Sequence, residues 1–217
     1  MNILRNSSLH PGWPLAVGPL RVAAGVVRLR PVRMRDAAQW SRIRLADRNH
    51  LEPWEPSAGV EWTVRHTVSS WPVMCSSLRS EARKGRMLPY AIELDGQFAG
   101  QLTIGNVTHG ALRSAWIGYW VTSSATGGGV ATGALALGLD HCFGPVTLHR
   151  VEATVRPENA ASRAVLAKVG FREEGLLRRY LEVDGAWRDH LLVALTTEEV
   201  YGSVTSALVR NGGAHWA

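Results

Sequence analysis

The sequence has little cysteine: the chain of 217 residues contains two, Cys75 and Cys142. A disulfide-stabilised scaffold needs several paired cysteines, and a zinc site needs closely spaced ligands, so both classes are excluded. The two thiols lie far apart in the sequence and form no metal-ligand pair. This cysteine usage is typical of a reducing compartment, and we therefore expect a cytoplasmic protein that uses no metal.

The chain also lacks the pattern of a secretory leader and of a membrane span. Two prolines break the apolar stretch at 13–20, and the region before it carries one arginine. Residues 114–139 carry no charge, but polar residues and glycines interrupt them between Ser123 and Gly129. A helix that crosses a bilayer needs about 20 mostly apolar residues. This segment instead favours a strand, a glycine loop and a helix, and we expect no membrane association.

The signatures of nucleic-acid-binding modules are missing too, although the net charge is +6 and the isoelectric point is about 10.0. There is no run of Lys or Arg, no zinc-finger spacing and no aromatic stripe like that of an RNA-recognition strand. The arginines are scattered along the chain. We therefore predict no direct nucleic-acid site and favour a small, highly anionic ligand.

What is present is globular composition, with 46% hydrophobic and 19% charged residues in 217 residues. This length suits one domain that can stabilise its own core. We expect an N-terminal extension at 1–25, the domain at 26–200 and a C-terminal tail at 201–217. The sequence does not indicate the oligomeric state.

Helical and strand patterns alternate along the domain, which predicts a mixed α/β (α+β) fold. We expect a helix at 36–45 with Asp36 as its N-cap, and a helix from residue 60 that ends or kinks at Pro72. Asp95-Gly96 predicts the turn of a hairpin. The remaining elements are expected as strands at 26–30, 90–94, 97–104, 116–121, 150–155, 171–181 and 191–195, and helices at 130–143 and 159–168.

The first segment that carries chemistry is Thr126-Gly127-Gly128-Gly129-Val130-Ala131, between a predicted strand and a predicted helix. Glycines let a ligand approach the backbone closely, and the free N–H groups of a helix start attract phosphate oxygens. The loop is followed by no Lys-Ser/Thr, so it is no Walker loop, and it is no Rossmann fingerprint. A flexible turn without a ligand is the alternative interpretation.

The second segment is Asn159-Ala160-Ala161-Ser162, followed by a helical pattern that ends at Gly170-Phe171. With the glycine loop before it, this order resembles the GNAT superfamily of acetyl-coenzyme A-dependent N-acetyltransferases. The flanking segments 48–56, 117–120 and 174–180 resemble the RimJ/RimL group of ribosomal-protein N-terminal acetyltransferases. The resemblance implies a GNAT fold, with a central, twisted, mostly antiparallel sheet, a splayed parallel strand pair and flanking helices.

The resemblance also implies acetyl-CoA as cosubstrate and a set of residues that bind it. Two positions depart from the family pattern: Thr126 and Gly128 replace a glutamine and an arginine of the usual loop. An arginine at position 128 would then be expected to tighten CoA binding. The expected CoA-binding residues are Tyr119, Trp120, Val121, Thr126, Gly127, Gly128, Gly129, Val130, Ala131, Thr132, Asn159 and Ser162.

Acetyl transfer needs an acceptor for the amine proton, a backbone N–H near the oxyanion and a donor near the sulfur. By resemblance, Trp120 and Val121 are the expected amide donors, and Ser162 is the hydroxyl nearest the sulfur. Leu166 occupies the position where many relatives carry a tyrosine as general acid. Glu152 is the candidate base if the even-numbered face of its strand lines the cleft. A helix-start serine bonded to backbone and a salt-bridged strand carboxylate are the alternative interpretations.

The acceptor side is expected to include Trp54, as a wall between two prolines, and Tyr180. Four acidic residues against one arginine lie between 47 and 61, and Glu52 and Glu55 would form an acidic wall that attracts a basic chain end. We therefore predict acetylation of a protein N-terminus, with a ribosomal protein as the candidate partner. An acetyltransferase of a small amine (an amino acid, polyamine or antibiotic) and a non-catalytic CoA-binding module remain the alternatives.

Overall fold

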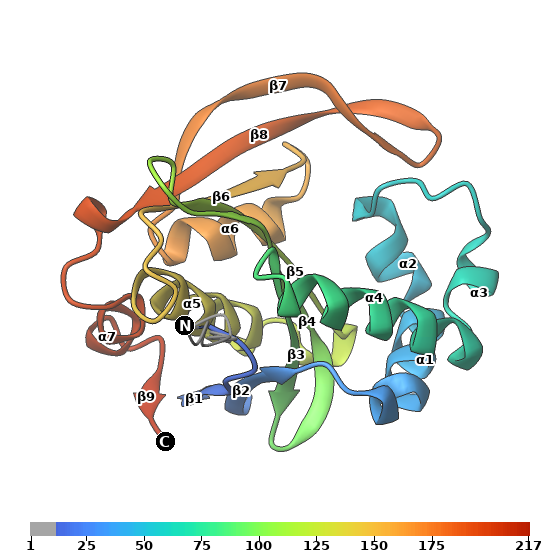
Figure 1. Ribbon diagram of the computed structural model, residues 1–217, viewed down its shortest axis with the longest axis horizontal. Coiled ribbons are helices and arrows are strands. Elements are labelled where there is room, and N and C mark those ends of the chain that lie inside the picture. Colours follow the sequence, from blue (N-terminus) through green and yellow to red (C-terminus); the bar gives the residue numbers. More distant parts are fainter. Residues whose placement is uncertain (1–11) are drawn as a thin grey trace, which may run out of the picture.

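A computed structural model describes residues 12–217, and its centre is one open sheet (Figure 1). Within the described residues the sheet has nine strands in the order β7-β8-β6-β5-β4-β3-β2-β1-β9. The strands are β1 (Val17–Val22), β2 (Gly25–Pro31), β3 (Met87–Leu94), β4 (Gln97–Thr108), β5 (Ser114–Val121), β6 (Arg150–Val155), β7 (Arg172–Val183), β8 (Ala186–Thr196) and β9 (His215–Trp216). The helices are α1 (Ala37–Ala46), α2 (Arg48–Leu51), α3 (Trp62–Arg65), α4 (Trp71–Arg83), α5 (Val130–Phe143), α6 (Ala160–Lys168) and α7 (Val204–Arg210).

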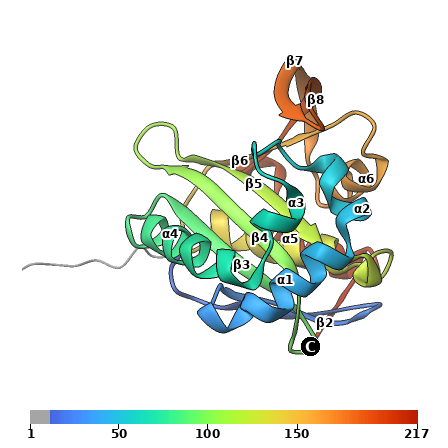
Figure 2. The same ribbon diagram turned by 90° about the vertical axis from the view of Figure 1, so that its right-hand side faces the viewer.

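Helices cover both faces of the sheet because side chains of one strand alternate between two cores. On β3, Tyr90 and Ile92 belong to the larger core, which contains α5, whereas Ala91 belongs to the core beneath α1 and α4. Figure 2 shows α1 and α4 on one side of β3 and β4, with α5 on the other. The predicted mixed α/β fold is confirmed.

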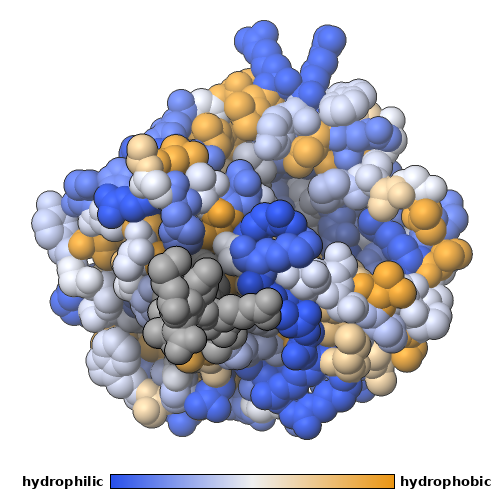
Figure 3. Space-filling view, in the orientation of Figure 1, coloured by the Kyte–Doolittle hydropathy of each residue, from blue (hydrophilic) through white to orange (hydrophobic). Residues whose placement is uncertain are grey.

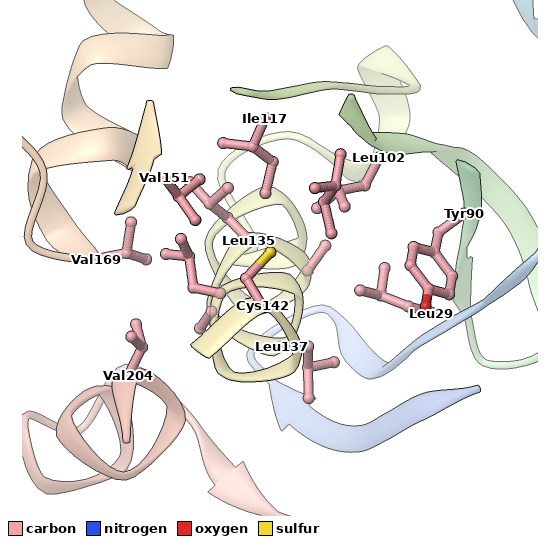
Figure 4. Packing of buried hydrophobic residues seen from close by; sticks show 14 of the residues in the cluster. Leu29, Tyr90, Leu102, Ile117, Leu135, Leu137, Cys142, Val151, Val169 and Val204 are labelled. Atoms are coloured by element: carbon pink, nitrogen blue, oxygen red, sulfur yellow. The ribbon is translucent and has the colours of Figure 1, made fainter. Parts of the chain in front are cut away.

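Helix α5 is central because it is apolar on every side. Leu135, Leu139 and Cys142 are fully buried, and the helix carries no charge before Asp140. In Figure 4, side chains from α5 point toward neighbours on β2, β4, β5 and β6. This packing fixes the N-terminus of α5, and with it the glycine loop, against the centre of the sheet.

Strands β5 and β6 form the parallel pair, and their pairing is short. Ser114, Ala115 and Trp116 pair with Arg150, Val151 and Glu152, and no pairing of the two strands is recorded beyond them in the described chain. All other neighbouring strands are antiparallel. The strands therefore diverge after residues 116 and 152, as expected for a splayed pair, and the gap opens toward Tyr119 and Val155.

Two local predictions in the first half of the chain are wrong. Pro72 lies in the first turn of α4, where its missing N–H has no partner to lose, so it begins a helix that runs to Arg83. Asp36 does not cap α1 with its side chain. Its carboxylate instead accepts two hydrogen bonds from the buried Arg30, at 2.8 and 2.9 Å.

The segments on either side of the expected domain also join this sheet and core. Strand β1 pairs with β2 on one side and with β9 on the other. Val204 and Leu208 of α7 are buried in the main core. The expected boundaries at 25/26 and 200/201 therefore do not coincide with an edge of the packed structure, and residues 1–11 of the extension lie outside the described residues. Between residues 12 and 217, no helix is long and apolar enough to cross a membrane.

Candidate active site

A cavity of about 120 Å³ lies where β5 and β6 diverge. Trp54, Leu166 of α6 and His190 are among the residues that line it, and Figure 3 shows this face hollowed below the β7–β8 hairpin. The lining residues are Trp54, Ile117, Tyr119, Ala153, Thr154, Val155, Arg156, Asn159, Ser162, Leu166 and His190. Of the predicted site residues, the structure thus brings Tyr119, Asn159, Ser162 and Trp54 together.

Asn159 and Ser162 are held by the start of α6. The Asn159 side-chain oxygen accepts the N–H of Ser162 at 3.0 Å, which is the geometry of a helix N-cap. The Ser162 hydroxyl lies 3.0 Å from the hydroxyl of Tyr119. Burial raises the pKa of Tyr119 to about 12, so its phenol stays protonated at neutral pH. Asn159 therefore places the serine, and the serine presents a hydroxyl to the cavity.

The glycine loop has the backbone shape that was expected. Gly127 and Gly129 have φ of +75° and +83°, which side-chain-bearing residues rarely adopt. A side chain at Gly127 would meet no atom within 4 Å, so this residue faces open space. The first turn of α5 follows at Val130, and its N–H groups have no acceptor within the helix. The segment fits a pyrophosphate, because backbone donors and an open approach meet there.

The space beside the second glycine, Gly128, is filled by the turn between the N-terminal strands. The N–H of Ala24 donates to the carbonyl of Gly128 at 3.0 Å, and a Cβ at Gly128 would lie 2.5 Å from the Cβ of Ala24. The turn between β1 and β2 thus packs where relatives carry a long side chain.

Gly128→Arg is consequently expected to destabilise the protein by about 1–3 kcal/mol, as overpacking does, and not to tighten CoA binding. Thermal unfolding and calorimetry with CoA measure both effects. The double variant Ala24→Gly/Gly128→Arg should recover part of the stability. A tighter complex in the single variant would show that the turn moves aside without cost.

The backbone N–H groups of β5 alternate in direction, and that of Trp120 does not point toward the gap between β5 and β6. Gln101 pairs with Trp120, and the N–H of Thr122 donates to Ala99 on β4. Because N–H groups alternate in direction along an antiparallel strand, the N–H of Trp120 faces β4, and those of Tyr119 and Val121 face the gap. Val121 thus remains a candidate amide donor, whereas the N–H of Trp120 faces β4.

Glu152 is not among the lining residues of the cavity. It lies beside Trp116 before the strands diverge, and its carboxylate accepts a hydrogen bond from Arg150 at 2.7 Å. Arg150 also pairs with Glu174. Of the even-numbered residues of β6, Thr154 is the one among the lining residues given above. The structure therefore supports the alternative of a salt-bridged strand carboxylate.

The acidic residues expected on the acceptor side are occupied by arginines. Glu52 pairs with Arg48 at 2.6 Å, and Glu55 pairs with Arg65 and with the buried Arg44. The ring of Trp54 is 39% exposed and lies beneath the guanidinium of Arg156, which also donates to the carbonyl of Pro53. The wall of the cavity is thus the tryptophan, and the charges of Glu52 and Glu55 are compensated.

Glu55→Gln is expected to destabilise the fold by about 2–3 kcal/mol. The side chain of Arg44 is only 4% exposed, so removing its carboxylate leaves a buried charge without its counter-ion. Denaturant unfolding measures the loss. Glu61→Gln, a change of the same chemistry at an exposed residue, should stay within about 0.5 kcal/mol. Equal midpoints for the two variants would contradict the compensated arrangement.

His190 of β8 is a further functional candidate. It is 4% exposed, lines the cavity, and packs edge-on against Tyr180, whose ring is 5.7 Å away. Its Nδ1 lies 3.1 Å from the carbonyl oxygen of Arg188. A bond from Nδ1–H to this oxygen leaves the lone pair on Nε2. The pattern Asp189-His190 resembles a surface turn in sequence, and only the strand pairing of β8 reveals its burial. Within residues 12–217, no group of His, Cys, Asp and Glu is arranged to hold a metal.

Known proteins share this arrangement. The family profile described as an acetyltransferase (GNAT) domain matches residues 27–172. The solved structure of Mycobacterium smegmatis RimJ in complex with CoA-disulfide is 76% identical, with a TM-score of 0.95, and covers 96% of this chain and 100% of that chain.

Two curated relatives extend the likeness at lower identity. The [ribosomal protein uS5]-alanine N-acetyltransferase of Escherichia coli is 28% identical over 190 residues, which are 87% of this chain and 96% of the relative. The probable N-acetyltransferase YjcK of Bacillus subtilis is 28% identical over 171 residues, or 78% of this chain and 93% of the relative. The chain therefore belongs to the GNAT family of acetyltransferases, and acetyl-CoA is its cosubstrate.

Proposed function

We propose that the protein transfers the acetyl group of acetyl-CoA to the N-terminal amine of a protein in the cytoplasm, and that this protein is ribosomal. The observation that carries the proposal is the likeness to RimJ over nearly the whole chain, together with the 96% of the E. coli ribosomal-protein acetyltransferase that aligns with it. A second observation, the segment that crosses the acceptor side of the cavity, supports the free end of a chain as the acceptor.

The acceptor side is bridged by the tip of the β7–β8 hairpin. Pro56 pairs with Val183, and the N–H of Ser57 donates to the carbonyl of Glu182 at 2.8 Å. In Figure 1 the hairpin reaches from above the sheet to the segment between α2 and α3. A bridge of this kind obstructs a side chain in the middle of a folded surface, whereas the free end of an extended chain can pass beneath it.

The glycine loop, the end of β5 and the residues that line the cavity together suggest how the chemistry proceeds. The glycine loop and the N-terminus of α5 bind the pyrophosphate. The N–H of Val121 stabilises the oxyanion that forms when the amine attacks the thioester. His190 Nε2 takes the amine proton, and the Ser162 hydroxyl donates to the sulfur as the carbon–sulfur bond breaks. Glu152 has no step in this scheme.

The test is a transfer assay with acetyl-CoA on peptides that copy the N-termini of ribosomal proteins, with spermidine and free amino acids as competing acceptors. Mass spectrometry should place the acetyl group on the α-amine of the peptide, and blocked peptides with an internal lysine should stay unmodified. Preferential acetylation of the small amines would establish the alternative acceptor class. CoA binding without turnover on any acceptor would establish a non-catalytic module.

A further inference from the structure

Tyr119 and Ser162 meet in the cavity from different elements. Tyr119 lies near the C-terminal end of β5, past the point where β5 and β6 diverge, and Ser162 lies in the first turn of α6. Their hydroxyl oxygens are 3.0 Å apart, and both residues line the cavity. Leu166, one turn further along α6, lines the same cavity and has no donor. In the proposed reaction the leaving sulfur needs a hydrogen bond, and this hydroxyl pair can supply one.

The distances favour one acceptor for the phenol, although across the 3.0 Å contact either hydroxyl can be the donor. The Tyr119 oxygen is 3.4 Å from the backbone carbonyl oxygen of Ser162 but 3.0 Å from its Oγ. Hydrogen bonds between oxygens are strongest near 2.7–2.8 Å and weaken with length, so the shorter contact is the better one. When the phenol donates to Oγ, the hydrogen of Ser162 is free to point elsewhere.

We infer that Tyr119 is a positioning residue for the leaving group: its hydroxyl donates to Ser162 Oγ and so directs the Ser162 hydrogen toward the sulfur of acetyl-CoA. The inference rests on the proposed function of the site as an acetyl-transfer centre. It adds a residue on β5 that acts on the sulfur only through Ser162. Two hydrogen bonds in series polarise each other, so each strengthens the other as negative charge develops.

The proton balance makes this a hydrogen-bonding role. As the new N–C bond forms and the C–S bond breaks, the sulfur leaves as a thiolate and the amine proton passes to the base. An ordinary thiol has a pKa of about 8.5, and burial raises the pKa of Tyr119 to about 12. Transfer of the phenol proton to the thiolate would therefore be unfavourable by roughly three pKa units. Tyr119 keeps its proton throughout, and the thiolate is protonated by water after transfer.

The first experiment titrates the thiol of bound CoA and needs no acceptor. Thiolate absorbance of the CoA complex is followed against pH, with the complex of desulfo-CoA, which lacks the sulfur, as the reference. In the parent complex, the pKa of the CoA thiol should be about one unit lower than in free CoA, since the thiolate accepts one charge-assisted hydrogen bond. Ser162→Ala should abolish this shift and Tyr119→Phe should remove about half of it. Desulfo-CoA should bind the parent and Tyr119→Phe equally well.

The second experiment is a double-mutant cycle on turnover. Tyr119→Phe should lower kcat about tenfold with little change in the KM for acetyl-CoA, because the donor matters most as charge develops. The double variant with Ser162→Ala should be no slower than Ser162→Ala alone, because the phenol acts through the serine. Tyr90→Phe is the matched control: its phenol is also buried, donates to the Gly12 carbonyl at 2.9 Å, and lies outside the lining residues. It should leave kcat unchanged.

The inference is overturned if Tyr119→Phe leaves both kcat and the thiol titration like the parent, or if the two substitutions lower kcat independently. It is also overturned if Tyr119→Phe weakens desulfo-CoA binding as much as CoA binding, since the phenol then acts only on packing. Failure of the proposed function looks different: the parent itself would not acetylate peptides, while the titration of bound CoA would still report the role of Tyr119.

Discussion

Gly127→Asp is expected to weaken CoA binding at least about 100-fold while the protein stays folded. The new carboxylate would face the open side of the glycine loop, because a side chain there meets no protein atom within 4 Å. Two like charges about 4 Å apart at an effective dielectric constant near 20 repel by about 4 kcal/mol, so a loss of about 3 kcal/mol is reasonable. Asp also tolerates positive φ better than most residues, and φ is +75° here.

Calorimetry with CoA measures the affinity, and two controls separate the causes. Gly127→Asn adds the same volume without the charge and should cost much less affinity. Pantetheine, which lacks the pyrophosphate, should bind the parent and Gly127→Asp alike. Unchanged CoA affinity in Gly127→Asp would show that the pyrophosphate does not lie at this loop.

Gly129, the next glycine with positive φ, is a poorer place for this test. A Cβ there would lie 3.3 Å from Val22 of β1, so a substitution at Gly129 pushes on the protein as well as on the ligand. The sequence shows three equivalent glycines in a row, and only the packing of β1 against the loop separates them. A side chain at Gly127 would face outward, one at Gly128 would meet Ala24, and one at Gly129 would meet Val22.

Elements governed by local chemistry were predictable from the sequence. Asp95 and Gly96 both have positive φ, as the hairpin turn they were expected to form requires. Gly170 ends α6 with φ of +98°. The strand–loop–helix reading of the charge-free segment is also right, because a helix that is apolar on all sides has to be buried in the middle of a core.

Features set by partners distant in sequence were not predictable. The sequence predicted Asp36 as a helix cap, but its buried carboxylate forms an ion pair with Arg30. Glu55 looked free for a substrate, yet Arg44 and Arg65 pair with it. Charge counted along the chain therefore overstated the acidity of the acceptor side. Ion pairs depend on which side chains the fold brings together, and composition over a window does not contain that information.

The position of Glu152 relative to the cavity was not predictable for a related reason. Alternation along β6 correctly separated its two faces, but it could not show how far along the strand the cavity begins. The cavity begins beyond Glu152, at the residues 153–155 where β6 has left β5. His190 reaches the same space from β8, whose Leu191 pairs with Val155.

His190→Gln is expected to lower kcat about 100-fold, the lower end of what a positioned general base contributes, with little change in the KM for acetyl-CoA. Glutamine can still donate to the Arg188 carbonyl, so the orientation of the side chain is kept, but its amide cannot take a proton. The acidic limb of the pH–rate profile should disappear in the variant, because that limb reports loss of the proton-accepting form of the base. Initial rates with saturating peptide across the pH range provide the measurement.

Glu152→Gln is the matched control, since it removes a titrating group from the neighbouring strand and should leave the profile like that of the parent. Other buried histidines do not complicate the comparison: burial and the charge of Arg44 lower the pKa of His66 to about 4, and burial also lowers the pKa of His141. His66 therefore stays neutral over the working range of the assay. If His190→Gln kept its acidic limb and Glu152→Gln lost it, the proton would leave by way of Glu152. If both variants kept it, water alone would carry the proton away, and His190 would serve only to line the cavity.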